Sequence, residues 1–195
     1  MGFVQGRVDL REKDGRLQMS RDGGATWNDV GSSGWSVVER KAITVDAQSY
    51  TFSSLNGDLD EAYMISAEIK GGAGAAGGLL SLRPNGLTSN QIGDAIISDT
   101  GGAPTVDPGR TELMLGYTPV AGRFASSYGT LFAKTGSDRC LDSNGGIASI
   151  RRVFKAYSRW TDTAINITSL VVFSADPPGL GVGTVLTLYK RAIPG

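Results

Sequence analysis

Alternation of apolar and polar residues is the feature that most constrains the fold of this chain. It is clearest in the segment 61–70, where one face carries Tyr63, Ile65, Ala67 and Ile69 and the other carries Ser66, Glu68 and Lys70. Successive side chains of a β-strand point to opposite faces, so this period of two predicts a strand with one buried and one exposed face.

Nine further runs of β-favouring residues are found at 35–45, 50–52, 79–82, 95–98, 112–117, 128–133, 148–157, 165–173 and 182–191. The chain also has 28 glycines and only 7 prolines, which fits short strands joined by tight turns better than helices. Several connections are longer than hairpin loops. The sequence therefore predicts an all-β fold, a jelly-roll-like or other Greek-key antiparallel β-sandwich rather than an up-and-down barrel.

The first 34 residues form a separate segment of three short β-type runs, followed by the flexible Gly/Ser linker 31–34. We therefore expect residues 1–34 to form a small β-meander arm and residues 35–195 to form the sandwich. A meander of this size cannot bury its own apolar side chains, so we expect it to attach to the sandwich or to another chain through them. The predicted attachment residues are Val8, Leu10, Leu17, Met19, Trp27 and Val30.

Within the arm, residues 20–27 match the Asp-box pattern Ser-x-Asp-x-Gly-x-Thr-Trp once. Asp22 can accept backbone N–H bonds inside a turn, and Trp27 can fold its ring over the hairpin. Sialidase-type β-propellers repeat this motif from blade to blade, whereas a single copy in 195 residues is too little for a propeller. The motif therefore predicts a stabilised hairpin with no catalytic role.

Composition disfavours several classes of function. Lys plus Arg and Asp plus Glu each total 19, so the formal net charge is +0 and binding to a nucleic-acid backbone is not expected. Histidine is absent, which removes the usual general base and the commonest zinc ligand. The single Cys140 is interpreted as a buried structural thiol. Without a signal-peptide pattern or an apolar stretch of roughly 18 residues, neither export by a signal peptide nor membrane attachment is expected.

Two segments look superficially like ligand-binding loops. Asn56, Asp58 and Asp60 carry side-chain oxygens at alternate positions, which is the spacing of calcium loops. The glycine and the distal glutamate of an EF-hand are missing, so we prefer an acidic turn and keep these residues only as weak metal candidates. The glycine-rich run 71–78 lacks the lysine of a phosphate-binding loop, and we interpret it as a mobile loop or a tightly packed backbone at a subunit contact. No cofactor and no catalytic residue is predicted.

A carbohydrate site would need exposed aromatic rings beside polar groups. The candidate rings are Trp35, Tyr117, Tyr157 and Trp160, and for each of them core packing is the more common fate. Trp160 lies at the end of a predicted strand and is marked as a possible ligand contact. The pair of carboxylates that a glycosidase needs is not recognisable, because most candidates fall in predicted turns. These candidates are Asp22, Asp46, Asp58, Asp138 and Asp142.

Four segments carry turn-and-strand patterns: 50–63, 82–86, 165–170 and 181–191. Together they resemble the sandwich of a virion structural protein of tailed bacteriophages, over about residues 37–191. Such proteins decorate or cement capsids or form parts of tail and head fibres, usually as homotrimers. The resemblance implies the same fold, partners and virion location for this chain, and it brings no catalytic residues.

Three functions follow as hypotheses. The first is a capsid decoration protein, folded in the host cytoplasm, whose arm binds the major capsid protein or another virion protein while a trimeric sandwich stabilises the head through many repeated contacts. The second is a receptor- or glycan-binding module at a tail or fibre tip, using the loop 99–104 and Trp160. The third, an Asp-box hydrolase, is disfavoured because no acid–base pair is visible.

Overall fold

The computed structural model describes residues 9–13, 16–20, 28–29, 34–98, 103–137 and 139–192 of the 195-residue chain. The chain divides into two compact units, Met1–Trp35 and Ser36–Gly195. This division lies one residue after the boundary expected from the sequence. Regular structure in the described residues consists of strands and one 3₁₀ turn, η1 (Ala148–Ile150). None of the described helical structure is long and apolar enough to cross a membrane.

The first unit contains a three-stranded antiparallel sheet in the order β1 (Asp9–Lys13), β2 (Arg16–Ser20) and β3 (Asn28–Asp29). The predicted β-meander is thus confirmed. Val8, the Asp-box segment 21–27 and Val30 lie outside the described residues. Leu10, Leu17 and Met19 are described by their backbone alone. The attachment role of these apolar residues therefore stays a prediction.

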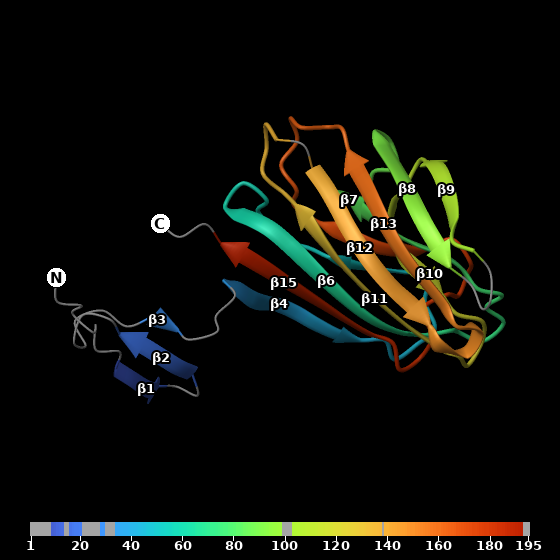
Figure 1. Cartoon of the computed structure of the whole chain (residues 1–195), viewed down its shortest axis with the longest axis horizontal. Helices are drawn as coiled ribbons and strands as arrows, with labels where there is room; N and C mark the ends of the chain where they lie inside the picture. The colour runs from blue at the N-terminus through green and yellow to red at the C-terminus, as the bar shows by residue number, and fades with distance from the viewer. Residues whose placement is uncertain are drawn as a thin grey trace. The chain divides into compact units, whose positions relative to one another are not determined.

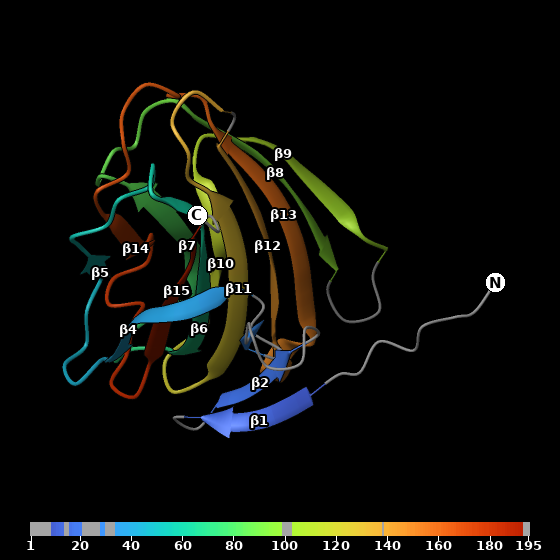
Figure 2. The ribbon, with the colours of Figure 1, turned by 90° about the vertical axis from the view of Figure 1, so that its left-hand side faces the viewer.

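Two antiparallel sheets form a β-sandwich in the second unit, as the sequence predicted (Figures 1 and 2). The small sheet has the order β10 (Leu113–Thr118), β7 (Gly78–Pro84), β14 (Leu170–Ser174), β5 (Ser49–Phe52). The large sheet has the order β4 (Trp35–Ala42), β15 (Val185–Ala192), β6 (Asp60–Lys70), β11 (Phe124–Phe132), β12 (Arg139–Ile147), β13 (Arg152–Trp160), β8 (Gln91–Ser98), β9 (Thr105–Arg110).

Neighbouring strands are often far apart in the sequence. The strand β14 pairs with both β5 and β7, and β15 lies between β4 and β6. An up-and-down barrel would place consecutive strands side by side throughout, so this strand order agrees with the predicted long crossover connections.

The alternation that predicted a strand at 61–70 is confirmed in β6. Its inward side chains, Ile65, Ala67 and Ile69, are buried and pack in one core with Leu80 and Leu82 of the small sheet. The intervening residues of β6 are more exposed and point away from the small sheet. Burying one face of each sheet against the other is what holds the two layers together.

Two strands were not predicted. The run from Asp142 to Gly146 resembles a turn in composition, yet it lies inside β12, where pairing to β11 and β13 on both sides fixes it as a strand. The prediction that Asp142 lies in a turn is therefore wrong. The second, β9, carries Pro108 and Gly109 and is tolerated because it is the edge strand beyond β8. The run predicted from 148 becomes a strand only at Arg152, after η1.

Candidate binding surface

The outer face of the large sheet, the face that points away from the small sheet, exposes many large apolar side chains. Between 46% and 66% of each of the following is exposed: Ile92, Ile96, Val106, Phe124, Tyr128, Phe132, Val153 and Tyr157. They belong to four strands, β11, β13, β8 and β9, and β12 lies between β11 and β13 in the same sheet. The inward neighbours of these residues form the core. An exposed sheet face of this kind is a candidate binding surface.

The pairing of the strands places outward residues in rows that cross the sheet. In one row, Glu68 lies opposite Ser126, Ser126 opposite Gly146, and Gly146 opposite Val153. The adjacent row is bulkier, because it contains Tyr128 and, further along, Asn144, Lys155 and Ile96. Ser126 and Gly146 in the first row are small, and beside the larger residues of the next row they leave a depression that runs across the strands. We call it the transverse groove.

The transverse groove consists of three adjoining hollows of about 300, 370 and 220 Å³. The first two share Ser126, Gly146 and Ala148, and the second and third share Val153. The groove therefore extends from Glu68 on β6 to Ile96 on β8. Its middle part is bordered by the turn that contains η1.

Basic side chains outnumber acidic ones along the groove. Arg151, Arg152 and Lys155 line its middle and far hollows, and Glu68 lines the hollow at the β6 end. Arg151 has φ 50°, in the left-handed region that few side chains other than Asn and Gly adopt readily. The Lys155 ammonium lies 3.9 Å from the Asp142 carboxylate, with both side chains largely exposed. Such an exposed pair holds the ammonium only weakly, so it can also meet a ligand.

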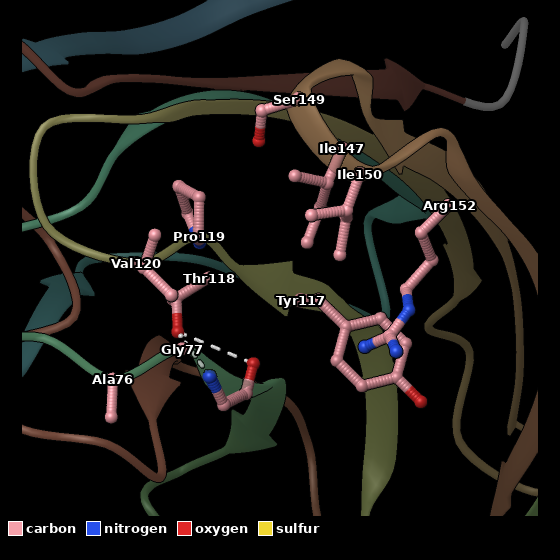
Figure 3. Close-up of a pocket in the computed structure, with 11 residues that line it drawn as sticks. Ala76, Gly77, Tyr117, Thr118, Pro119, Val120, Ile147, Ser149, Ile150 and Arg152 are labelled. Atoms are coloured by element: carbon pink, nitrogen blue, oxygen red, sulfur yellow. Dashed lines mark hydrogen bonds between the residues drawn. The ribbon is translucent and has the colours of Figure 1, made fainter. Parts of the chain in front are cut away.

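A separate pocket of about 160 Å³ lies on the other side of the same turn and shares Ile147 and Arg152 with the groove (Figure 3). Tyr117 is nearly buried in it, with the Arg152 guanidinium 5.2 Å from the centre of its ring. Ile150 and Val120 add further apolar surface. The pocket suits a small apolar or aromatic group beside a cation.

The glycine-rich run 71–78 forms one wall of this pocket with Gly77 and Gly78. Its amides are already engaged, because Ala76 N and Gly77 N donate to the Asp176 carboxylate at 2.6 and 2.8 Å. A Cβ atom on Gly72 would lie 2.0 Å from the carbonyl oxygen of Pro178. The run is thus a tightly packed backbone within its own chain, and its subunit-contact role stays a prediction.

The side-chain oxygens of the three weak metal candidates have separate partners. Asn56 Oδ1 accepts a hydrogen bond from Asn166 Nδ2 at 3.0 Å, and the backbone amide and hydroxyl of Thr135 donate to Asp58 Oδ1. The hydrogen bonds from Thr135 lower the pKa of Asp58 below its usual range.

Asp60 is nearly buried, with Oδ1 3.0 Å from the ammonium of Lys190 and Oδ2 accepting the Tyr63 hydroxyl at 2.8 Å. The carboxylates therefore hold neighbouring segments together rather than converging on one point. No group of three or more His, Cys, Asp or Glu that could hold a metal ion occurs among the described residues.

Trp160, the predicted ligand contact, is fully buried, so that prediction is wrong. The last residue of β13 points inward, and the guanidinium of Arg139 covers its ring at 4.8 Å from the ring centre. Cys140 is partly exposed on β12 rather than buried, and the Tyr157 hydroxyl donates to its sulfur at 2.7 Å. Of the candidate rings, Tyr157 is the one that lies largely exposed on the outer face.

Sequence reasoning missed the transverse groove, although all of its strands except β12 were predicted. The run predicted in this part of the chain, 128–133, begins after Ser126, whereas the alternation of outward and inward residues in β11 extends back to Phe124. The partners of Ser126 depend on β12, which was not predicted. Of the expected ligand loop 99–104, residues 99–102 lie outside the described residues, and Pro104 borders the far hollow of the groove.

No family model matches this chain, and no curated protein sequence does. Among solved structures it is similar to the alginate lyase Aly36B, with a TM-score of 0.35 and 13% identity over 78% of each chain. A variant of that enzyme in complex with alginate trisaccharide gives a TM-score of 0.31 and 14% identity over 80% of this chain and 81% of that one. Likeness of this degree carries no argument about activity or substrate.

Proposed function

We propose that this chain is a non-enzymatic structural protein of a larger assembly. In the form implied by the sequence resemblance, it is a decoration or cement protein of a tailed-bacteriophage virion that folds in the host cytoplasm and forms a homotrimer. Its N-terminal unit binds the major capsid protein or another virion protein, and its sandwich contacts other copies. Many such contacts, each of modest strength, would stabilise the head through avidity.

The observation that supports this proposal is the open edge of the large sheet at β4. This strand has no further neighbour on one side among the described strands, and most of its eight residues are exposed. An open edge offers backbone N–H and C=O groups to a strand of another chain. The opposite edge, β9, contains Pro108, which has no N–H to donate. The edge at β4 is therefore the better suited of the two for pairing within an assembly.

The test is the molar mass of the purified protein by light scattering at several concentrations, followed by sedimentation with undecorated heads. We expect a mass of three times 20.4 kDa. The exposed Val37→Lys substitution should lower self-association, because a lysine on an edge strand opposes pairing. Val45→Lys, which lies beyond β4, is the control. A monomer at every concentration that also fails to bind heads would contradict the proposal.

A second candidate function is the binding of a glycan or receptor at a tail or fibre tip. The observation that favours it is the transverse groove, in which the exposed ring of Phe124 lines one hollow and Arg151 lines the hollow that adjoins it. Trp160 has no part in this candidate because it is buried. An array of immobilised glycans tests it, and the absence of binding to every glycan on the array would contradict it.

A further inference from the structure

We propose that the transverse groove binds an acidic oligosaccharide, laid across the strands from β6 to β8 with its charged groups over β12 and β13, away from the β6 end. This inference rests on the second candidate function and is independent of the first. It is carried by three features of the groove: its direction across paired strands, the two aromatic rings that border Ser126, and the sign of its charges.

The direction of the groove excludes the usual way in which an extended peptide binds a sheet. The strands under it, β6, β11, β12, β13 and β8, are each paired on both sides, so their backbone groups are used within the sheet. A peptide lying across them would find no row of free N–H and C=O groups. A sugar chain needs none, because it is held by ring faces and by polar side chains.

Aromatic residues occupy the outward positions immediately before and after Ser126 on β11, and the first of them, Phe124, lines the groove itself. Phe124 and Tyr128 are 64% and 53% exposed, and both flank the small residue Ser126 on the same face of β11. Four residues of a strand span about 13 Å, which leaves space for one extended chain between the two side chains. A sugar ring seated over Ser126 would therefore contact an aromatic residue on each side.

The charged side chains of the groove favour an acidic sugar chain as the ligand. The formal net charge of the protein is +0, yet two exposed cations, Arg151 and Lys155, line the middle and far hollows of the groove, with Glu68 at its other end. A guanidinium group matches the two oxygens of a carboxylate or sulfate. The Glu68 carboxylate repels the carboxylate or sulfate groups of the ligand. We therefore place the charged sugars over β12 and β13. The other anionic polymer, a nucleic-acid strand, is less favoured because the rest of the chain offers no net positive charge.

The test is an array that pairs uronic-acid, sialic-acid and sulfated glycans with their neutral counterparts, and that also carries oligothymidylate. We expect the full-length protein to bind acidic glycans at least about tenfold more strongly than neutral ones, and to lose this binding as salt is raised. Equal binding of neutral glycans would overturn the acidic class while leaving glycan binding intact. Binding to no glycan would overturn both, and preferred binding of oligothymidylate would assign the groove to nucleic acid.

Two sets of variants locate the site. Ser126→Phe fills the floor of the groove with an exposed ring and should abolish binding, whereas Thr130→Phe, on the same face of β11 but two rows away, should retain it. The double variant Arg151→Asn with Lys155→Gln should weaken binding roughly tenfold, because two exposed cations are lost. Lys134→Gln, beyond the end of β11, is the charge control. If the groove variants bind like their controls while remaining folded, the groove is not the site.

Discussion

Arg139 brings a positive charge into the interior of the sandwich. Its guanidinium donates to the Asp162 carbonyl oxygen at 3.0 Å and to the Thr135 hydroxyl at 3.2 Å, and it covers the ring of Trp160. Burial lowers the pKa of Arg139, because the interior disfavours the charged form. Among the described residues Arg139 Nε has no hydrogen-bond partner. Packing of the Arg139 side chain therefore stabilises the fold, whereas removal of its charge from water destabilises it.

We expect Arg139→Ala to lower the free energy of unfolding by about 3 kcal/mol, because it leaves a cavity under Trp160. Arg139→Met should stay within about 1 kcal/mol of the natural protein, since an apolar side chain of similar volume removes the buried charge and keeps the packing. Urea unfolding followed by tryptophan fluorescence measures both. If the methionine variant is as unstable as the alanine variant, the hydrogen bonds to Asp162 and Thr135 carry the stability instead.

The hydrogen bonds of the Asp46 carboxylate lead us to expect that the stability of the protein depends on pH. Its carboxylate accepts the backbone N–H of Ala73 at 2.7 Å and that of Val182 at 2.8 Å, and these two bonds lower the pKa of Asp46. A pKa that is lower in the folded state adds stability at pH values above the unfolded pKa, near 3.8, and this stability is lost as the pH falls through the folded pKa.

The Asp46→Asn variant should therefore be less stable than the natural protein at pH 7, and this difference should shrink as the pH falls below about 4. Urea midpoints between pH 7 and pH 2 measure the difference. Asp142→Asn is the control, because that carboxylate is exposed on the outer face beside Lys155. If the difference in stability between the natural protein and Asp46→Asn is constant with pH, the two backbone hydrogen bonds do not require a charged carboxylate.

At the level of elements, the sequence predicted those strands in which apolar and polar residues alternate within the segment itself. From Tyr63 to Lys70 the residues of β6 alternate between buried and more exposed positions. By contrast, β12 contains Asp142, Asn144 and two glycines, and only pairing on both sides makes it a strand. Gly145 is required there because a Cβ atom would lie 2.1 Å from the Ser126 carbonyl oxygen. Glycines that suggest a turn in the sequence can thus lie inside a strand, where their lack of a side chain allows close contact with the neighbouring strand.

The segment 71–78 gives a prediction at the same scale. Gly72→Ala should lower the free energy of unfolding by about 3 kcal/mol, because its Cβ would meet the backbone of Pro178 and one of the two segments must shift. Gly74→Ala has open space and is opposed only by φ +85°, so it should cost about 1 kcal/mol. Urea unfolding compares the two. Equal effects would mean that the packing of this segment is loose.

At the scale of the whole molecule, the groove shows why the candidate site was less predictable than the fold. Burial against a second sheet follows from the alternation in each strand, whichever strands are neighbours. The groove requires a particular register, with Ser126 opposite Gly146 and Gly146 opposite Val153. Register is set by pairing between segments distant in the sequence, and a shift of one residue would turn every one of these side chains to the other face.

The division into two units gives the last prediction. Among the described residues, every member of the sandwich core lies between Ile43 and Leu188. Removal of residues 1–34 should therefore leave a cooperatively folding sandwich whose melting temperature changes by no more than about 3 °C, which corresponds to about 1 kcal/mol in a domain of this size. Thermal unfolding followed by circular dichroism measures the change, and binding to acidic glycans should persist because the groove is entirely within the sandwich. A fall of about 10 °C or more would instead contradict the independent folding of the sandwich.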